Sequence, residues 1–284
     1  MSRVAIVTDS ASDMDPAAAA RLGIRIVPLI VNFGAETFKA GVELSREDFW
    51  RRMTAPDAPF PTTAASSPGE FKAVYDAAFA DGAEAIVSVH VANTLSGTIK
   101  SAEIAKSMLP DREIHIVDSR AVSMAEGILA ELGVAMAADG MSAGDIARAL
   151  EARAPDISTF LAVETLEYLK KGGRISGARA AIGTILSVKP IIQVKDGLVD
   201  TADRVRTRSK ARERSIELTC SRPIERLSVL HTTNADVEAF RDALIARVPG
   251  GIDPARVSIE LVGASVGPHL GPGCVGAVAL HRPS

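Results

Sequence analysis

The residues best suited to binding a charged group lie in the polar turn Ala92–Thr98. This turn separates a β-branched run, Ile86–Val91, from a stretch whose apolar residues recur at helical spacing. Ser96 stands where a helix N-cap is expected, beside backbone N–H groups that have no partner inside the helix. A helix start surrounded by hydroxyls suits an anion, although an ordinary helix cap explains the same residues. The turn also offers further candidate supporting residues, namely Asn93, Thr94 and Gly97.

Small polar residues also close two other predicted strands. Asp9-Ser10 follows the strand Val4–Val7, and Asp118-Ser119 follows the strand Glu113–Val117. Alternating strands and helices predict a parallel sheet, and such sheets bind ligands at the carboxyl ends of strands where the strand order reverses. These two pairs are therefore candidate supporting residues, although Asp and Ser also cap the helices that follow strands.

One motif suggests a hydrolase. Gly263–Gly267 matches G-x-S-x-G, which presents a nucleophilic serine between a strand and a helix. The prolines and glycines that follow Ser265 argue against that helix, and the only histidine beyond this loop, His281, is expected at a frayed strand end. The segment is better explained as a stiff loop that holds His269 between two strands. In the same way, Gly172-Gly173 places Arg174 on a flexible break.

Metal and cofactor motifs are not evident. The five histidines share no ligand spacing, and Cys220 and Cys274 are far apart without a CxxC pattern. The sequence also lacks a Walker or Rossmann glycine motif, which argues against ATP or NAD as a bound cofactor. We therefore expect no metal, no cofactor and no catalytic residue.

A basic segment runs from Arg204 to Arg214. Six cations fall within these residues, opposed by the single carboxylate Glu213. A solvated helix face would explain the pattern, but the charge exceeds what solubility requires, so docking of a partner or a phosphate is the alternative. The candidate docking residues are Arg204, Arg206, Arg208 and Lys210.

Apolar periodicity and turn signals predict the elements that position these residues. We predict helices over Pro16–Leu22, Arg46–Met53, Pro68–Asp81, from Gly97 onward, and over Ala121–Ala138, Ser142–Ala154, Glu164–Lys171, Ala178–Val188 and Asn234–Val248. The predicted strands are Val4–Val7, Ile24–Phe33, Ile86–Val91, Glu113–Val117, Ile157–Val163, Lys189–Val194, Leu198–Val205, Arg226–His231, Val257–Val262 and Cys274–His281. Asp196-Gly197 predicts a hairpin turn.

Length and composition favour two α/β domains. The 284 residues are 47% hydrophobic, enough for a large core, and the polar junction Pro155-Asp156 separates a parallel α/β/α domain, residues 1–155, from a mixed-sheet α/β domain, residues 156–284. The net charge of −3 gives no reason to expect nucleic acid as a partner. The start of the chain does not resemble a signal peptide, and no apolar run reaches the length of about 20 residues that spans a bilayer, so we expect a cytoplasmic protein without stable membrane insertion.

The assembled motifs resemble those of the DegV family, the bacterial fatty-acid-binding carriers, over essentially the whole chain. The shared segments are the opening IVTDS, TAASSP followed by GEF, LSGT with SA downstream, IVDS, KKGGRIS, KPII and HLGPG. The resemblance implies two α/β domains with one long-chain fatty acid in the cleft between them. It implies that Thr63 and Ser96 bind the carboxylate, with Arg174 and His269 close by and Thr62 as a possible support. It further implies a separate ATP-dependent fatty-acid kinase that forms acyl phosphate for phospholipid synthesis.

The chain departs from the family pattern in two places. Thr63–Pro68 lacks two polar side chains that relatives commonly carry, and the usual glycine-rich start of the long helix is replaced by Ser123–Gly127. We expect these changes to affect the shape of the tail site or the choice of ligand, while the four head-group positions remain. The competing interpretations are an enzyme, either a phosphotransferase subunit with a dihydroxyacetone-kinase-like fold or the G-x-S-x-G hydrolase, and a regulatory binding module that uses the basic segment.

Overall fold

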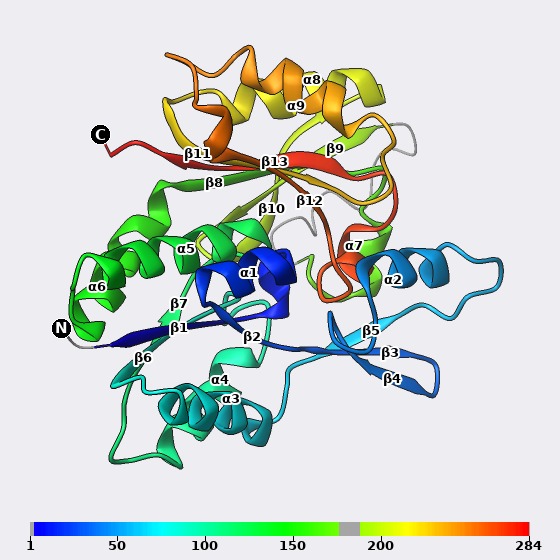
Figure 1. Cartoon of the computed structure of the whole chain (residues 1–284). Helices are drawn as coiled ribbons and strands as arrows, with labels where there is room; N and C mark the ends of the chain where they lie inside the picture. Colours follow the sequence, from blue (N-terminus) through cyan, green and yellow to red (C-terminus); the bar gives the residue numbers. More distant parts are fainter. Residues whose placement is uncertain (1–2, 176–187, 284) are drawn as a thin grey trace.

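The computed structural model describes residues 3–175 and 188–283, which form a two-domain α/β fold (Figure 1). The first part is a four-stranded parallel sheet with the strand order β2-β1-β6-β7. Its strands are β1 (Val4–Asp9), β2 (Arg25–Val27), β6 (Ala85–His90) and β7 (Glu113–Asp118). Because β1, β6 and β7 pair in parallel, their carboxyl ends and the turns that follow them share one edge of the sheet.

Helices cover both faces of the parallel sheet, as its doubly buried strands require. α3 (Pro68–Ala80) and α4 (Thr98–Ser107) pack on one face through a cluster that includes Phe71, Tyr75 and Ala102. α5 (Met124–Ala138) and α6 (Ala143–Arg153) lie on the other face (Figure 1).

The second part is a six-stranded mixed sheet with the strand order β10-β9-β8-β13-β11-β12. α8 (Arg208–Thr219) and α9 (Val237–Ile245) cover its outer face, where Ile216, Phe240 and Leu244 form a second apolar cluster. The strands are β8 (Ile157–Ala162), β9 (Lys189–Lys195), β10 (Leu198–Val205), β11 (Ile224–His231), β12 (Val257–Leu261) and β13 (Val275–His281). The predicted hairpin is confirmed, because β9 and β10 are antiparallel neighbours joined at Asp196-Gly197.

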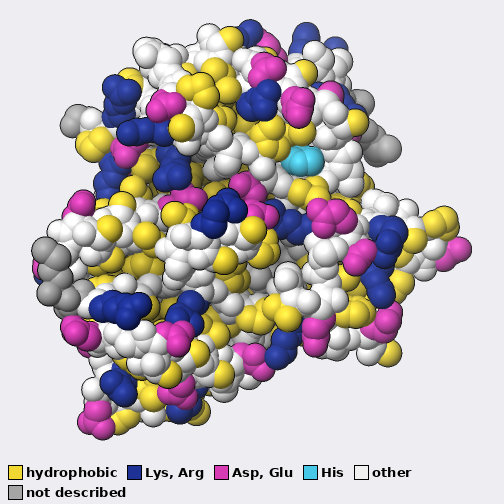
Figure 2. All heavy atoms as spheres, viewed as in Figure 1, with side chains coloured by type: hydrophobic (Ala, Val, Ile, Leu, Met, Phe, Trp, Pro, Cys, Tyr) yellow, Lys and Arg dark blue, Asp and Glu magenta, His cyan; other side chains and the backbone are white. Residues whose placement is uncertain are grey.

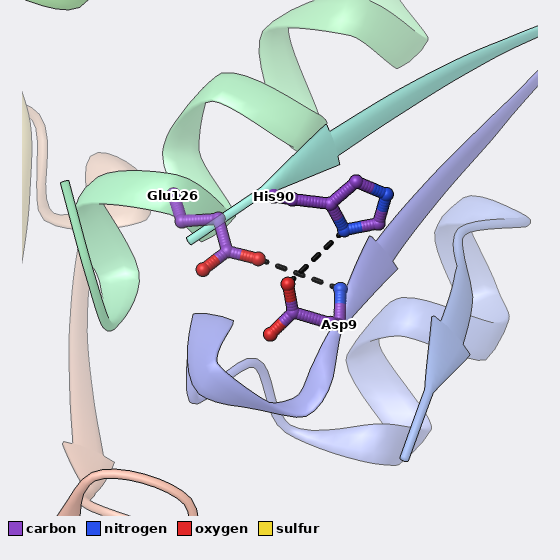
Figure 3. Close-up of side chains that lie close together, drawn as sticks. All are labelled: Asp9, His90 and Glu126. Atoms are coloured by element: carbon purple, nitrogen blue, oxygen red, sulfur yellow. Dashed lines mark hydrogen bonds and ion pairs between the residues drawn. The ribbon is translucent and has the colours of Figure 1, made fainter. Parts of the chain in front are cut away.

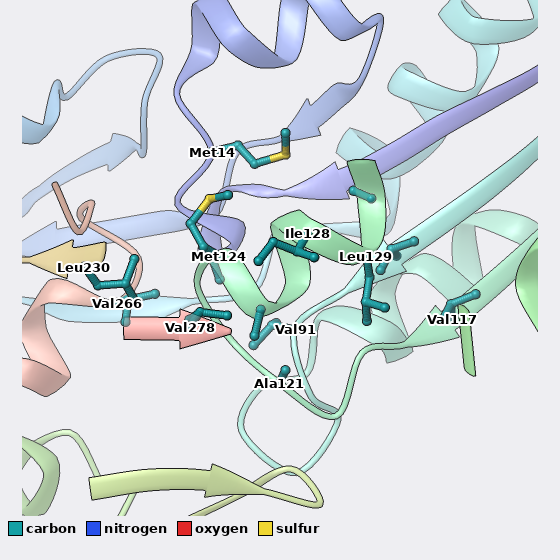
Figure 4. Close-up of a cluster of buried hydrophobic side chains, with 14 of the residues drawn as sticks. Met14, Val91, Val117, Ala121, Met124, Ile128, Leu129, Leu230, Val266 and Val278 are labelled. Atoms are coloured by element: carbon teal, nitrogen blue, oxygen red, sulfur yellow. The ribbon is translucent and has the colours of Figure 1, made fainter. Parts of the chain in front are cut away.

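The helix α5 packs between the two sheets. It contacts β1 and β6 on one side and β8, β11 and β13 on the other. Figure 4 shows Met124 and Ile128 of α5 in one cluster with Val91, which follows β6, and with Val278 of β13. The largest apolar core of the described residues is therefore shared by the two parts of the chain.

A third, small sheet has the strand order β4-β3-β5 and consists of β3 (Ile30–Phe33), β4 (Glu36–Lys39) and β5 (Thr62–Ala64). The prediction of a single strand over Ile24–Phe33 is wrong, because β2 ends at Val27 and β3 begins at Ile30 in a different sheet. Pro28 lies at this break and has no N–H to donate to a continuing ladder. In the small sheet, β5 pairs antiparallel with β3, which places Thr63 opposite Val31.

Several predicted helices are confirmed, and α1 (Pro16–Leu22) and α2 (Arg46–Met53) agree with the prediction to the residue. The predicted helix Glu164–Lys171 begins only at Glu167, as α7 (Glu167–Lys171). The expected loop after Gly263 contains one helical turn, α10 (Gly267–Leu270). Pro268 is compatible with it, because a proline in the first turn gives up no intrahelical hydrogen bond. The predicted helix Ala178–Val188 lies outside the described residues except for its last residue.

The predicted domain junction at Pro155-Asp156 falls in a short 3-10 turn, Ala154–Asp156, that joins α6 to β8. The other short turns that bear on the site are Ser10–Ser12, directly after β1, and Pro254–Arg256, directly before β12. None of the helices in the described ranges combines the length and the apolar character that crossing a bilayer requires.

Candidate functional site

A cavity lies between the two large sheets, at the carboxyl edge of the parallel one. Segments that follow β1, β6 and β7 form one wall, and β8, β9 and β10 form the opposite wall. The cavity holds about 860 Å³ of space free of protein atoms, part of which is open to solvent. Its lining is mainly aliphatic and includes Leu29, Val91, Leu95, Val122, Leu161, Leu169, Ile192, Val194, Val199, Val266 and Leu270. Such a lining suits a largely apolar ligand.

All four predicted head-group residues line this cavity. Thr63 reaches it from β5, Ser96 from the turn after β6, Arg174 from the break after α7, and His269 from α10. The Thr63 Oγ1 and His269 Nε2 atoms are 3.1 Å apart, so a hydrogen bond joins the first part of the chain to the second. The four residues come from four segments that are distant in the sequence, and the fold brings them to one cavity.

Burial determines the charge of His269. Removal of the ring from water, together with the positive charge of Arg174, lowers the pKa of His269 to about 4. The imidazole is therefore neutral near pH 7 and can donate only one N–H. The ring packs closely against Gly172, where a Cβ atom would lie 2.1 Å from His269 Nδ1. The absence of a side chain at residue 172 thus leaves the space that the imidazole occupies.

Arg174 is the only Lys, Arg, Asp or Glu side chain among the described residues that line the cavity. Its Nε donates a hydrogen bond of 3.1 Å to the Leu95 carbonyl, and its Nη1 donates one of 2.7 Å to the Gly172 carbonyl. These two bonds hold the half-buried guanidinium against the wall, and Nη2 has no hydrogen-bond partner in the described ranges. A single cation in a mainly aliphatic cavity favours a ligand that has one negative charge.

Ser96 contributes a hydroxyl to the cavity, but it is not the N-cap that we predicted. The N-cap of α4 is Gly97, and no side chain caps this helix. Ser96 Oγ lies 2.7 Å from Thr98 Oγ1 and accepts a 3.3 Å hydrogen bond from the Thr98 backbone N–H. Leu95 and Gly97 also line the cavity, so the part of the turn that faces the cavity is Leu95–Gly97.

Other residues of the predicted site lie elsewhere. Asn93, Thr94 and Thr62 are exposed and do not line the cavity. The Thr94 hydroxyl donates to the carbonyl of Gly197 at the tip of the β9–β10 hairpin, and the Gly197 N–H donates to the Arg120 carbonyl at 2.9 Å. The turns after β6 and β7 are therefore linked to the opposite wall of the cavity.

The strand-end pairs also turn away from the cavity. Asp118 accepts a hydrogen bond from the Arg120 N–H at 2.8 Å, and Ser119 Oγ accepts one from the Ala121 N–H at 3.1 Å, so both stabilise the turn that follows β7. Ser10 Oγ accepts from the Leu29 N–H at 2.8 Å. None of these side chains lines the cavity, and the expectation that they support the ligand directly is not met.

Asp9 belongs to a separate, fully buried cluster with His90 and Glu126 (Figure 3). One Asp9 oxygen lies 3.0 Å from His90 Nδ1, and Glu126 Oε1 accepts a 2.8 Å hydrogen bond from the Thr8 hydroxyl. From the sequence, Ser123–Gly127 was expected to affect the shape of the tail site or the choice of ligand. The structure instead places Glu126 beside Asp9, which residue spacing along the chain did not reveal.

The geometry around Ser265 does not match a hydrolase. Ser265 Oγ lies 2.8 Å from Ser10 Oγ and has no hydrogen bond to a histidine among the described residues. His269 contacts Thr63 instead, and His281 is buried on β13 with its Nε2 2.8 Å from Ser158 Oγ, so the expected frayed end is wrong. A serine without a base within hydrogen-bonding distance lacks the activation that a nucleophile needs.

The basic segment is partly neutralised within the molecule. Arg208 Nε lies 3.0 Å from Glu164, Arg214 Nε lies 2.6 Å from Asp203, and Arg212 pairs with Asp236. Arg204, Arg206 and Lys210 are exposed and make no ion pair in the ranges described. None of the docking candidates lines the cavity. On the face shown in Figure 2, basic and acidic side chains are interspersed.

Comparisons with known proteins agree with this architecture. The model of the family described as "Uncharacterised protein, DegV family" matches residues 3–282. This chain belongs to the DegV family. A DegV domain-containing protein of Streptomyces coelicolor is 36% identical over 288 residues, which cover 99% of this chain and 100% of that protein.

Solved structures of DegV proteins share the fold along the whole chain. A structure described as fatty acid binding of a DegV family protein from Thermus thermophilus has a TM-score of 0.89 and 33% identity, and covers 99% of this chain and 100% of that one. A stearic-acid-binding protein from Eubacterium ventriosum has a TM-score of 0.88 and 27% identity, with 99% and 98% coverage. The predicted combination of a parallel sheet and a mixed sheet in one α/β chain is thereby confirmed for this DegV protein, while the domain bounds 1–155 and 156–284 stay a prediction.

The sequence analysis of this DegV chain missed most of the cavity wall. Thr159, Leu161, Ile192, Val194 and Val199 come from three neighbouring strands of the mixed sheet and face the cavity together. Their alternation along β8 and β9 was a usable signal, because residues two apart on a strand share one face. The alternation shows which residues share a face of a strand. It does not show which face borders the cavity, because that depends on how α5 packs.

Proposed function

We propose that this protein is a fatty-acid carrier that holds one long-chain fatty acid in the cavity between its sheets. In this proposal the carboxylate binds at Thr63, Ser96, Arg174 and His269, and the acyl tail lies against the aliphatic wall. The observation that carries the proposal is the composition of the cavity, in which Arg174 is the only charged side chain among described lining residues that are otherwise mainly aliphatic. The DegV proteins described as fatty-acid-binding support the same ligand class.

The energetics of such a ligand favour a carrier. Burying about fourteen methylenes at roughly 0.8 kcal/mol each would contribute around 11 kcal/mol before entropy losses. A hydrogen bond to a charged group contributes roughly 1.5–3 kcal/mol. The tail would thus provide most of the affinity, and the polar residues would fix where the carboxylate lies.

The head-group residues suggest how each contact would form. Thr63 and Ser96 would donate their hydroxyl hydrogens to the carboxylate, and the Nη2 of Arg174 would supply a charged donor. The neutral His269 would hold Thr63 in place through its Nε2 atom or donate its single N–H to the ligand. Three donors from both parts of the chain would then converge on one carboxylate.

We further propose that the bound carboxylate is presented to a separate ATP-dependent fatty-acid kinase for phospholipid synthesis. There the carboxylate oxygen would attack the γ-phosphorus of ATP, and ADP would leave to give acyl phosphate. The exposed cations Arg204, Arg206 and Lys210 are the proposed docking residues, since Arg208 is already paired with Glu164.

Native mass spectrometry of the purified protein tests the carrier proposal. We expect the folded protein to have an added mass equal to one fatty acid, and denaturation to release that mass. Delipidated protein should regain it from added stearic or oleic acid. A purified bacterial fatty-acid kinase with ATP should then form acyl phosphate, trapped as the hydroxamate. Protein that stays empty with both acids would refute the carrier, whereas loading without phosphorylation would refute only the role of the kinase.

A further inference from the structure

The cluster of Asp9, His90 and Glu126 combines three groups that can bind metals and that come from three elements. Asp9 ends β1, His90 ends β6, and Glu126 lies in the first turn of α5. One donor atom from each residue lies within 4.8 Å of the other two, and all three residues are fully buried. Figure 3 shows that the three side chains point toward one another. The cluster is distinct from the lipid cavity, because none of the three residues lines it.

Neighbouring groups hold each of the three side chains in place. Asp9 Oδ1 accepts from the Ala11 N–H at 2.8 Å, and Glu126 Oε1 accepts from the Thr8 hydroxyl at 2.8 Å. The Nε2 atom of His90 lies 2.6 Å from Ser88 Oγ, which in turn lies 2.9 Å from the Tyr75 hydroxyl. A histidine that binds a metal usually donates its other ring N–H to such an oxygen, so Nδ1 of His90 is the atom left for a ligand role.

The cluster is short of positive charge. Two carboxylates are buried side by side, and neither forms an ion pair with a Lys or Arg among the described residues. The Oε2 atom of Glu126 is buried without a hydrogen-bond partner in the described part of the chain. Burying two carboxylates without a positive partner costs free energy, and a proton or a metal ion bound between them offsets this cost.

We propose that Asp9, His90 and Glu126 bind one divalent transition-metal ion, Zn²⁺ or Mn²⁺. One imidazole nitrogen and two carboxylate oxygens are a donor set suited to these ions. Around an ion with bonds of about 2.1 Å, tetrahedral donors lie about 3.4 Å apart. Because the donor atoms of the cluster lie within 4.8 Å of one another, no pair needs to close by more than roughly 1.4 Å on binding. The bound ion links β1, β6 and α5. Ala11 follows β1 and Val91 follows β6, and both residues line the cavity.

Because the cluster is fully buried, the test supplies the metal while the protein folds. Chain unfolded in urea with EDTA is refolded with either ZnCl₂ or MnCl₂, passed through a desalting column with EDTA, and analysed for bound metal by mass spectrometry. We expect about one retained ion per chain and a rise in Tm relative to protein refolded without metal. Refolding with CoCl₂ should give the visible absorption bands of a low-symmetry nitrogen and oxygen site.

Glu126→Gln is the test variant, and Glu131→Gln on the same helix is its control. Glu131 is also largely buried but pairs with Arg226 outside the cluster. We expect retained metal to fall at least tenfold in Glu126→Gln and to stay at the parent level in Glu131→Gln. The proposal is overturned if folded parent protein retains no metal and shows no cobalt bands, or if Glu126→Gln retains metal as the parent does. The parent measurements decide the proposal even if Glu126→Gln does not fold.

Discussion

Replacing Gly172 by alanine should displace His269 and weaken fatty-acid binding without unfolding the protein. The added Cβ would lie 2.1 Å from His269 Nδ1 and 2.7 Å from its Cε1. Real Cβ atoms do not approach other atoms so closely, so either the imidazole or the end of α7 must move. A movement of the ring large enough to relieve this clash should break its 3.1 Å contact with Thr63.

The expected size of the effect follows from the contacts at the head group. When the ring is displaced, one hydrogen bond is lost that either binds the charged ligand or holds a residue that binds it. Such a hydrogen bond contributes roughly 1.5–3 kcal/mol to binding. This corresponds to a Kd about 10- to 100-fold higher. Binding is not abolished, because the aliphatic wall that holds the tail is unchanged.

Gly173→Ala is the matched control, since it adds the same methyl group one residue later. No atom of the residues that the structure describes lies within 4 Å of a Cβ at residue 173, but the backbone there has φ +71°, which L side chains rarely adopt. Alanine at this position should lower the free energy of unfolding by about 1 kcal/mol and leave Kd unchanged. Gly172 has φ −77°, which alanine adopts freely.

Titration calorimetry of delipidated protein with oleic acid measures Kd, and urea unfolding measures stability. The reasoning predicts a loss of affinity in Gly172→Ala alone and a loss of stability in Gly173→Ala. If Gly172→Ala binds as tightly as the parent, His269 does not support the carboxylate. If Gly173→Ala loses as much affinity as Gly172→Ala, the effect comes from the backbone of the loop rather than from the ring.

Three further predictions concern the same molecule. Thr63→Ala combined with Ser96→Ala removes two charge-assisted hydrogen bonds, which should weaken the binding free energy by roughly 3–6 kcal/mol if the two effects add. The double variant should keep some lipid in native mass spectrometry but exchange it faster than the parent. An unchanged exchange rate would show that these hydroxyls do not bind the lipid. The folded pKa of His269, about 4, lies below its unfolded value near 6.5, so its contribution to stability is complete above pH 6.5 and is lost as pH falls toward 4. Between pH 6.5 and pH 4, the free energy of unfolding of lipid-free His269→Asn, measured by urea titration, should therefore fall by roughly 2–3 kcal/mol less than that of the parent. If the two free energies change with pH in parallel, the lowered pKa of His269 is contradicted. Replacing both Arg204 and Arg206 by Glu should slow phosphorylation of bound lipid without changing the lipid content. Replacing the exposed Arg51 and Arg148 by Glu should change neither the phosphorylation rate nor the lipid content. Loss of lipid from the first variant would instead place the basic segment at the cavity.

The sequence was most informative where local physics decides the structure. The helices predicted from Pro16 and Arg46 begin at those residues, where the structure shows Asp15 and Ser45 as N-caps, and the predicted turn at Asp196-Gly197 joins a hairpin. It was least informative where distant segments compete for the same position. The run Ile24–Phe33 has strand character throughout, yet Pro28 divides it between two sheets, and only the tertiary fold determines which sheet each half joins.

The same distinction applies to the site. The motifs that contain Thr63, Ser96, Arg174 and His269 are recognisable in the sequence, and the structure places all four at one cavity. The pairs Asp9-Ser10 and Asp118-Ser119 follow the same pattern at strand ends, but their side chains form hydrogen bonds within the protein and do not line the cavity. Strand-end polarity therefore predicts the edge of the sheet that carries a site and not which side chain faces it. The Asp9, His90 and Glu126 cluster lies outside such reasoning, because no spacing connects its members.

The position of α5 limits how a ligand can enter. Much of this helix is buried around its full circumference, so it belongs to both layers at once and fastens them together. A hinge that swung the two halves apart would expose this shared apolar surface to water, at a cost far above thermal energy. We therefore do not expect a ligand to enter by separation of the two halves. A substitution in α5 affects the packing of this helix against both sheets. Neither half can therefore be exchanged independently of the other. A chain of one half alone would expose to water either the apolar surface of α5 or the sheet face that α5 covers.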